Sequence, residues 1–214
     1  MTGWQVAGYV GWFGLMIATF PREFWPKLQQ DKTYQHWVMA SVVALFFLWS
    51  LRAGLVTGLQ VHFLLLTVLT LCHGWKIACL VGAIPVLLQI IFGLLPIANG
   101  GLYGLTGVML PVLFSYGVFL LIYRFCARHL FIYIFLAAFI NSALTMAVHM
   151  LLTSGWIWGA GEYSWTYIVE NYLVLMPLLL FPEGLLNGMA ITLLVVYRPE
   201  WVRTFHDSDY IDGK

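Results

Sequence analysis

Charged side chains are scarce in this chain of 214 residues: only 9% are Asp, Glu, Lys or Arg, whereas 62% are hydrophobic. Soluble domains carry about 25% charged residues, so the composition excludes an ordinary soluble protein. The formal net charge is only +1, and the basic residues are spread over several short segments. Nucleic-acid binding, which needs a basic surface, is therefore not expected. The sequence predicts an integral membrane protein.

Motifs for enzymatic chemistry are missing as well. The three cysteines form no C-x-x-C pair, which argues against a sulfur-rich zinc site and against covalently attached haem. No G-x-x-x-x-G-K-[ST] or H-E-x-x-H sequence occurs, so neither ATP hydrolysis nor zinc peptidase activity is indicated. No Ser-His-Asp arrangement can be assembled either. We therefore expect a protein that is not an enzyme.

Long apolar stretches dominate what is present. A bilayer core of about 30 Å needs about 20 apolar residues per helix, and unpaired backbone amides in lipid force such stretches to be helical. The fold class predicted is an all-α membrane protein with about seven transmembrane helices, in one domain over residues 1–201. A short polar cytoplasmic tail, 202–214, follows, and its acidic end from His206 to Lys214 is expected to be disordered. The predicted spans are 4–20, 37–53, 58–75, 78–97, 104–123, 130–153 and 171–197.

Basic residues orient these spans. With the N-terminus outside and the C-terminus in the cytoplasm, nine of the ten Lys and Arg residues face the cytoplasm and only Arg52 lies outside. This agrees with the positive-inside rule. The partition depends on a turn at 73–76, which divides an almost continuous apolar run over residues 55–97.

Ionisable groups in or near the spans are the candidates for function, because each is costly in lipid unless paired or hydrated. Glu183, which follows Pro182, is the carboxylate placed well inside a span; a structural role and a role on a transport path both remain open. His62 and His149 fall near the outer face, as do Glu162 and Glu170. Imidazole and carboxylate groups suit ions such as Co, Ni or Zn, so these residues form a candidate capture site. Histidines that are merely hydrogen-bonded between helices are the alternative.

Three segments together resemble a known family. They are Val56 to Leu64 with His62, the Gly-Gly loop and following span from Asn99 to Arg124, and the glutamate-bearing helix with its Arg-Pro tail from Pro182 to Trp201. The set is similar to the CbiM/NikM family, the substrate-specific membrane subunits of energy-coupling-factor ABC importers for cobalt and nickel. The resemblance implies a permease of the bacterial-type cytoplasmic (inner) membrane. Its implied partners are a transmembrane coupling subunit and cytoplasmic ATPase subunits.

The family places its metal near the outer face, on the amino-terminal amine and backbone, a histidine directly after the initiator Met, and a histidine that starts the third helix. His62 matches the last of these. Thr2 stands where the family has the amino-terminal histidine. Either His149, Glu162 or Glu170 replaces the missing ligand, or the pocket takes a different substrate.

Two functions of other classes remain open. In a haem-binding or redox-associated membrane subunit, His62 and His149 would be axial ligands. In a non-catalytic membrane assembly protein, the polar groups would be structural. The glycines at 100, 101, 104 and 107 predict close helix approach, either inside the bundle or at a docking face.

Overall fold

The computed structural model describes residues 2–54 and 58–210. In these ranges the chain is helical and forms no β-strand, apart from one antiparallel bridge between Ala53 and Val61. The helices are α1 (Gly3–Ala18), α2 (Phe24–Gln30), α3 (Lys32–Ser50), α4 (Leu66–His73), α5 (Trp75–Ile91), α6 (Ile97–Leu102), the π-helix η1 (Tyr103–Met109), α7 (Leu110–Phe125), α8 (Leu130–Ile132), the π-helix η2 (Tyr133–Ile140), α9 (Asn141–Gly159), α10 (Trp165–Asn171), the 3-10 helix η3 (Leu173–Leu175), α11 (Met176–Tyr197), the 3-10 helix η4 (Pro199–Trp201) and α12 (Asp207–Tyr210).

Several of these helices join into longer apolar rods. In the described part of the chain, three rods are long and apolar enough to cross a membrane: Ile97–Phe125, Leu130–Gly159 and Trp165–Tyr197. The shorter apolar helix Trp75–Ile91 lies on the predicted fourth span, and α1 and α3 lie on the first two. The all-α membrane class is therefore confirmed. The count of seven and the orientation remain predictions.

The third predicted span differs from its prediction. Only residues 66–73 are helical there, as α4, and eight residues cover about 12 Å of a core of about 30 Å. His62 lies in a non-helical segment before α4, so the helix expected over 58–75 is wrong for its first half. Val56 and Thr57, which begin the segment of family resemblance, lie outside the described residues.

Side chains from α11 form hydrogen bonds with the backbone of this non-helical segment. The Glu183 carboxylate accepts hydrogen bonds from the backbone N–H of Leu64 at 2.9 Å and of Leu65 at 2.8 Å. The Asn187 side-chain oxygen accepts from the Val68 N–H at 3.0 Å. Irregular backbone at membrane depth persists where protein groups satisfy it. Glu183 and Asn187 thus cap the start of α4 from across the bundle.

Close packing of α1 depends on glycine. A Cβ at Gly101 would lie 2.5 Å from Tyr9, and one at Gly104 would lie 2.3 Å from the Trp12 ring. Both distances are shorter than van der Waals contact, so only glycine allows α1 to lie this close to α6 and η1. The predicted close approach is confirmed for these two glycines, and it occurs inside the chain.

The end of the chain is more ordered than expected. The Thr204 N–H donates to the Leu71 carbonyl at the end of α4 at 3.2 Å. Asp207–Tyr210 form α12, and Tyr210 is only 5% exposed. The disordered end predicted for His206–Lys214 is therefore wrong for these four residues. Residues 211–214 lie outside the described range.

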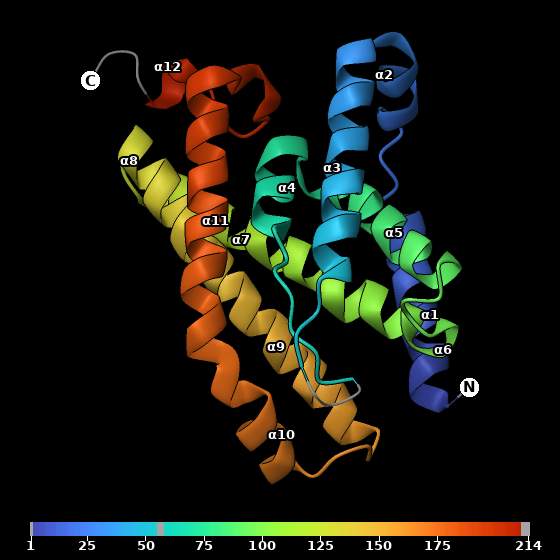
Figure 1. Cartoon of the computed structure of the whole chain (residues 1–214). Coiled ribbons are helices and arrows are strands. Elements are labelled where there is room, and N and C mark those ends of the chain that lie inside the picture. The colour runs from blue at the N-terminus through green and yellow to red at the C-terminus, as the bar shows by residue number, and fades with distance from the viewer. Residues whose placement is uncertain (1, 55–57, 211–214) are drawn as a thin grey trace.

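The two ends of the bundle are distinct (Figure 1). Helices α2 and α12 lie at one end, at the top of the view, and α10 lies at the other end. A cavity is present at each end. The one on the α10 side contains the histidines predicted as a capture site.

Candidate ligand-binding site

The cavity on the α10 side has a volume of about 360 Å³. It lies between the segment after α3, the link from α5 to α6, η1, and the end of α9. Its lining is rich in hydrogen-bonding groups. The polar lining residues are Arg52, Gln60, His62, Asn99, Tyr103, Thr106, His149, Thr153, Glu162 and Tyr172.

His62 and His149 face the same space. They are 6% and 4% exposed, and their ring centroids lie 5.9 Å apart with the planes at 77°. A metal–nitrogen bond is about 2.0–2.1 Å and the ring centre lies about 1 Å further, so two imidazoles on one tetrahedral ion have centres about 5 Å apart. The observed spacing is about 1 Å longer, so the two rings would have to move closer together to share one ion. The predicted approach of these two histidines is present in the fold.

The ring nitrogens differ in how they are bonded. Tyr103 places its hydroxyl 2.6 Å from Nε2 of His62, which leaves Nδ1 as the nitrogen for a ligand. Such an outer hydrogen bond orients a metal-bound histidine. Nδ1 of His149 is buried without any hydrogen-bond partner. Buried polar atoms are nearly always paired, so this nitrogen is an exception within the core.

Arg52 brings a positive charge to the rim. Its guanidinium carbon lies 5.3 Å from the centre of the Tyr103 ring, and its Nε donates to the Trp49 carbonyl at 2.9 Å. A second donor of the guanidinium contacts the side-chain oxygen of Gln89. These contacts hold Arg52 against the wall. The cavity therefore combines two imidazoles with a fixed cation beside Tyr103.

The two outer carboxylates have different positions. Glu162 lines the cavity, and its Oε2 lies 3.9 Å from the point where a Cβ would stand on Gly58. Glu170 is exposed on α10 and is absent from the lining. Within residues 2–54 and 58–210, no group of three or more His, Cys, Asp or Glu is close enough to hold one ion. Of the predicted ligands, His62, His149 and Glu162 therefore line the cavity without forming such a group.

Glu183 is not part of this cavity. It is 1% exposed. Its carboxylate accepts hydrogen bonds from the backbone N–H groups of Leu64 and Leu65 and from the side-chain amide of Asn187. Leu64 follows His62 by two residues. Of the two roles left open by the sequence, these contacts favour the structural one: Glu183 fixes the segment that carries His62.

Sequence reasoning did not single out Tyr103 or assign Arg52 a role at the site. An aromatic residue in an apolar helix looks like core, so nothing in the pattern distinguished Tyr103. Arg52 did carry a signal, because it is the one basic residue that the predicted topology leaves outside.

Comparison with known proteins gives one match. The model of the CbiM family, described as the cobalt uptake substrate-specific transmembrane region, matches residues 2–201. No curated protein and no solved structure matches the chain. The family match covers nearly the whole bundle, including His62, His149 and Glu183, and confirms the resemblance noted in the sequence. The chain therefore belongs to the CbiM family, whose members are membrane components of cobalt uptake systems rather than enzymes.

Proposed function

We propose that this protein is the substrate-binding membrane subunit of an energy-coupling-factor-type ABC importer for a transition-metal cation of the cobalt or nickel class. The ion is captured from outside in the cavity that contains His62 and His149. The observation that carries this proposal is the pair of buried imidazoles 5.9 Å apart, one with an unpartnered nitrogen. Imidazole is a preferred ligand of these metals.

His149 replaces the amino-terminal histidine of the family in this proposal. Thr2 lies at the start of α1, and the Gln5 side chain one turn later donates to Asn99 at 3.1 Å. Asn99 lines the cavity, so the start of α1 lies beside the site but supplies no imidazole there. Met1 lies outside the described residues. His149 instead enters from α9.

Release of the cargo requires a rearrangement of the bundle. Core side chains pack beside the site: Trp49, whose ring centre lies 6.2 Å from that of His62, and Met150, which follows His149 in α9, are each 0% exposed. Movement must be driven by partners, namely a transmembrane coupling subunit and cytoplasmic ATPases in a bacterial-type inner membrane. In this proposal, the conformation described is the one that captures the ion.

Elemental analysis and binding titration test the proposal. Purified protein loaded with Co²⁺ or Ni²⁺ should hold about one ion, and His62→Ala or His149→Ala should weaken binding by at least about 100-fold. Tyr103→Phe should weaken it by about 10–100-fold, the range found for groups that orient a metal-bound histidine. His36, exposed near the start of α3, provides the matched control, and His36→Ala should bind as wild type does.

Three results would contradict the proposal. Protein that stays metal-free after loading with Co, Ni, Zn and Cu would exclude a metal cargo. A Soret band in the purified protein would favour the haem-binding alternative. A ligand-dependent thermal shift that is the same in wild type and His62→Ala would favour the assembly protein.

A further inference from the structure

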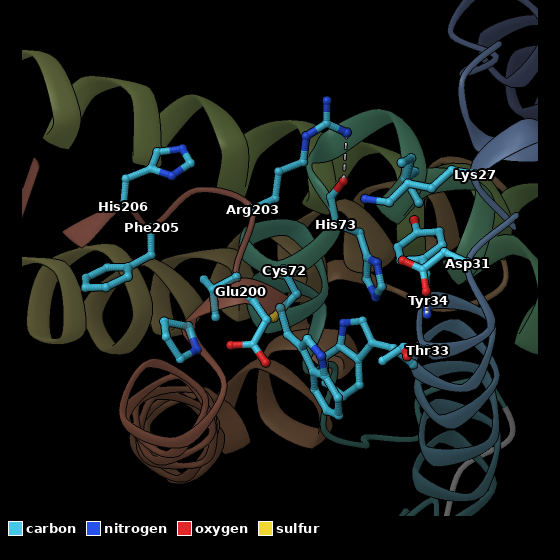
Figure 2. A pocket seen from close by; sticks show the side chains of 15 residues that line it. Lys27, Asp31, Thr33, Tyr34, Cys72, His73, Glu200, Arg203, Phe205 and His206 are labelled. Atoms are coloured by element: carbon cyan, nitrogen blue, oxygen red, sulfur yellow. Dashed lines mark hydrogen bonds between the residues drawn. The ribbon is translucent and has the colours of Figure 1, made fainter. Parts of the chain in front are cut away.

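A second cavity, of about 400 Å³, lies at the opposite end of the bundle from His62 (Figure 2). It is formed by α2, the start of α3, the end of α4 and the segment that follows α11. In Figure 2 the side chains of Lys27, Tyr34 and His73 approach one another on one side, and Arg203 reaches over from the other. Nothing in the proposed capture of a metal ion uses this cavity.

Polar atoms without a partner lie near it. Six buried side-chain polar atoms lack a hydrogen-bond partner in the described part of the chain, and three of them belong to residues of the lining: the Tyr34 hydroxyl, Nε1 of Trp37 and Nδ1 of His73. Each of these three atoms has less than 1 Å² of accessible surface, so a ligand in the cavity reaches it only if the side chain turns. The groups that a ligand contacts without such a movement are the charged side chains of the lining.

Cationic groups face the same space. The Lys27 amine lies 4.4 Å above the centre of the Tyr34 ring and has no carboxylate within ion-pair distance among the described residues. The Arg203 guanidinium donates to the His73 carbonyl at 3.4 Å, and it pairs with the exposed Glu23 at 3.1 Å. Two cations thus lie close to the unpartnered atoms.

The carboxylates of the lining already have partners. Asp31 accepts the Tyr34 N–H at 3.0 Å and so caps the start of α3. Glu200 lies 3.6 Å from Arg198 at the surface. Among the charged side chains of this lining, Lys27 is therefore the one without an ion-pair or hydrogen-bond partner in the described residues.

An apolar groove continues from this cavity along the bundle. Its volume is about 380 Å³, and it shares Trp37, Cys72 and His73 with the polar cavity. Ala44 on α3 and Ala190 on α11 lie on its two sides. The small alanine side chains leave the space between these helices open. The two spaces together form one pocket with a polar end and an apolar end.

We propose that this combined pocket binds one glycerophospholipid of the leaflet on that side, which our topology makes the cytoplasmic leaflet. The phosphate lies in the polar cavity, where it faces Lys27 and Arg203. One acyl chain lies in the groove between α3 and α11. Basic residues at the cytoplasmic membrane surface attract lipid head groups, and Lys27 has no carboxylate partner among the described residues.

The other occupants fit less well. A free phosphate ion would pair with Lys27 but would leave the apolar groove without a role. An apolar helix of a partner protein would cover the groove but would leave Lys27 without a negative partner. A phospholipid satisfies both ends with one molecule.

Native mass spectrometry of the full chain in detergent tests this. Delipidated protein is mixed with palmitoyl-oleoyl phosphatidylethanolamine, with the corresponding phosphatidylglycerol, or with inorganic phosphate. We expect one retained phospholipid per protein. Lys27→Gln should reduce retention about fivefold, the equivalent of about 1 kcal/mol for one basic side chain at a lipid surface. Ala44→Trp, which fills the groove, should abolish it.

Each variant has a matched control close to it in the sequence. Lys32 is exposed near Lys27 but does not line the cavity, and Val43 is exposed beside Ala44 on α3 but does not line the groove. Lys32→Gln and Val43→Trp should retain lipid as wild type does. Retention of phosphate but no phospholipid would overturn the proposal. Equal lipid retention by Ala44→Trp and Val43→Trp would also overturn it, and would leave the groove to a protein partner.

Discussion

One methyl group at Gly104 tests how tightly α1 is packed. The added Cβ would stand 2.3 Å from the Trp12 ring, so Gly104→Ala forces the two helices apart. Overpacking of this kind costs about 1–3 kcal/mol. We expect Gly104→Ala to lower the midpoint of thermal unfolding in detergent.

Gly117 offers the comparison within the same rod. A Cβ there meets nothing within 4 Å, and Ala favours a helix over Gly by about 1 kcal/mol. Gly117→Ala should therefore leave the midpoint unchanged or raise it. A Gly104→Ala protein as stable as Gly117→Ala would show that α1 does not pack as described.

At the residue scale, the sequence predicted the meeting of His62 and His149 but not its details. Their positions near the outer ends of two spans were enough to bring them together. The role of Tyr103 depends on where η1 places a ring relative to His62, which no linear pattern records. The exclusion of Glu170 likewise depends on which face of the short helix α10 turns inward.

At the element scale, α4 depends on side chains from another helix. Glu183→Gln keeps the size of the side chain but replaces one acceptor oxygen with a donor, so one of the N–H groups of Leu64 and Leu65 loses its partner. A buried donor left unpaired costs about 1–3 kcal/mol. We expect lower thermal stability together with weaker Co²⁺ or Ni²⁺ binding, because the same segment carries His62.

Glu170→Gln is the control for this change, since Glu170 is exposed and lies outside the cavity lining. It should match wild type in both unfolding midpoint and metal titration. If Glu183→Gln lost metal binding at unchanged stability, Glu183 would act on the cargo path instead of capping α4.

The half-length of α4 could not be predicted from the sequence. Residues 55–97 are almost continuously apolar, and hydropathy does not separate a buried helix from a buried extended segment. The deciding acceptor, Glu183, lies 118 positions after Leu65 in the chain. The turn at residues 73–76 was predicted from one Gly and one Lys, and Gly74 does end α4 with a φ of 77°.

For the whole molecule, the orientation in the membrane can be tested because the two ends of the bundle carry different segments. Lys27 and Arg203 line the cavity near α2 and α12, whereas Arg52 and Glu162 line the one near α10. Labelling with a membrane-impermeant maleimide tests the orientation. In a Cys126→Ser background, Thr166→Cys should react in intact cells, and Ser208→Cys only after permeabilisation.

Cys79, which is 1% exposed, should stay unlabelled in the same experiment. The parent Cys126→Ser protein, which keeps Cys72 in the lining of the second cavity, serves as the blank. The reverse pattern of labelling would place the His62 cavity on the cytoplasmic side. That result would contradict capture from outside even if the protein bound a metal ion.

The non-helical segment before α4 also has a consequence for biosynthesis. The N–H groups of Leu64 and Leu65 find their acceptor on Glu183, 118 to 119 positions later. At about 5–20 residues per second, the ribosome delivers that carboxylate about 6–24 s after these residues are made. During this interval the backbone N–H groups of the segment need water or another hydrogen-bond acceptor. The cavity that contains His62 can therefore assemble only once the last rod of the bundle has been synthesised and docked.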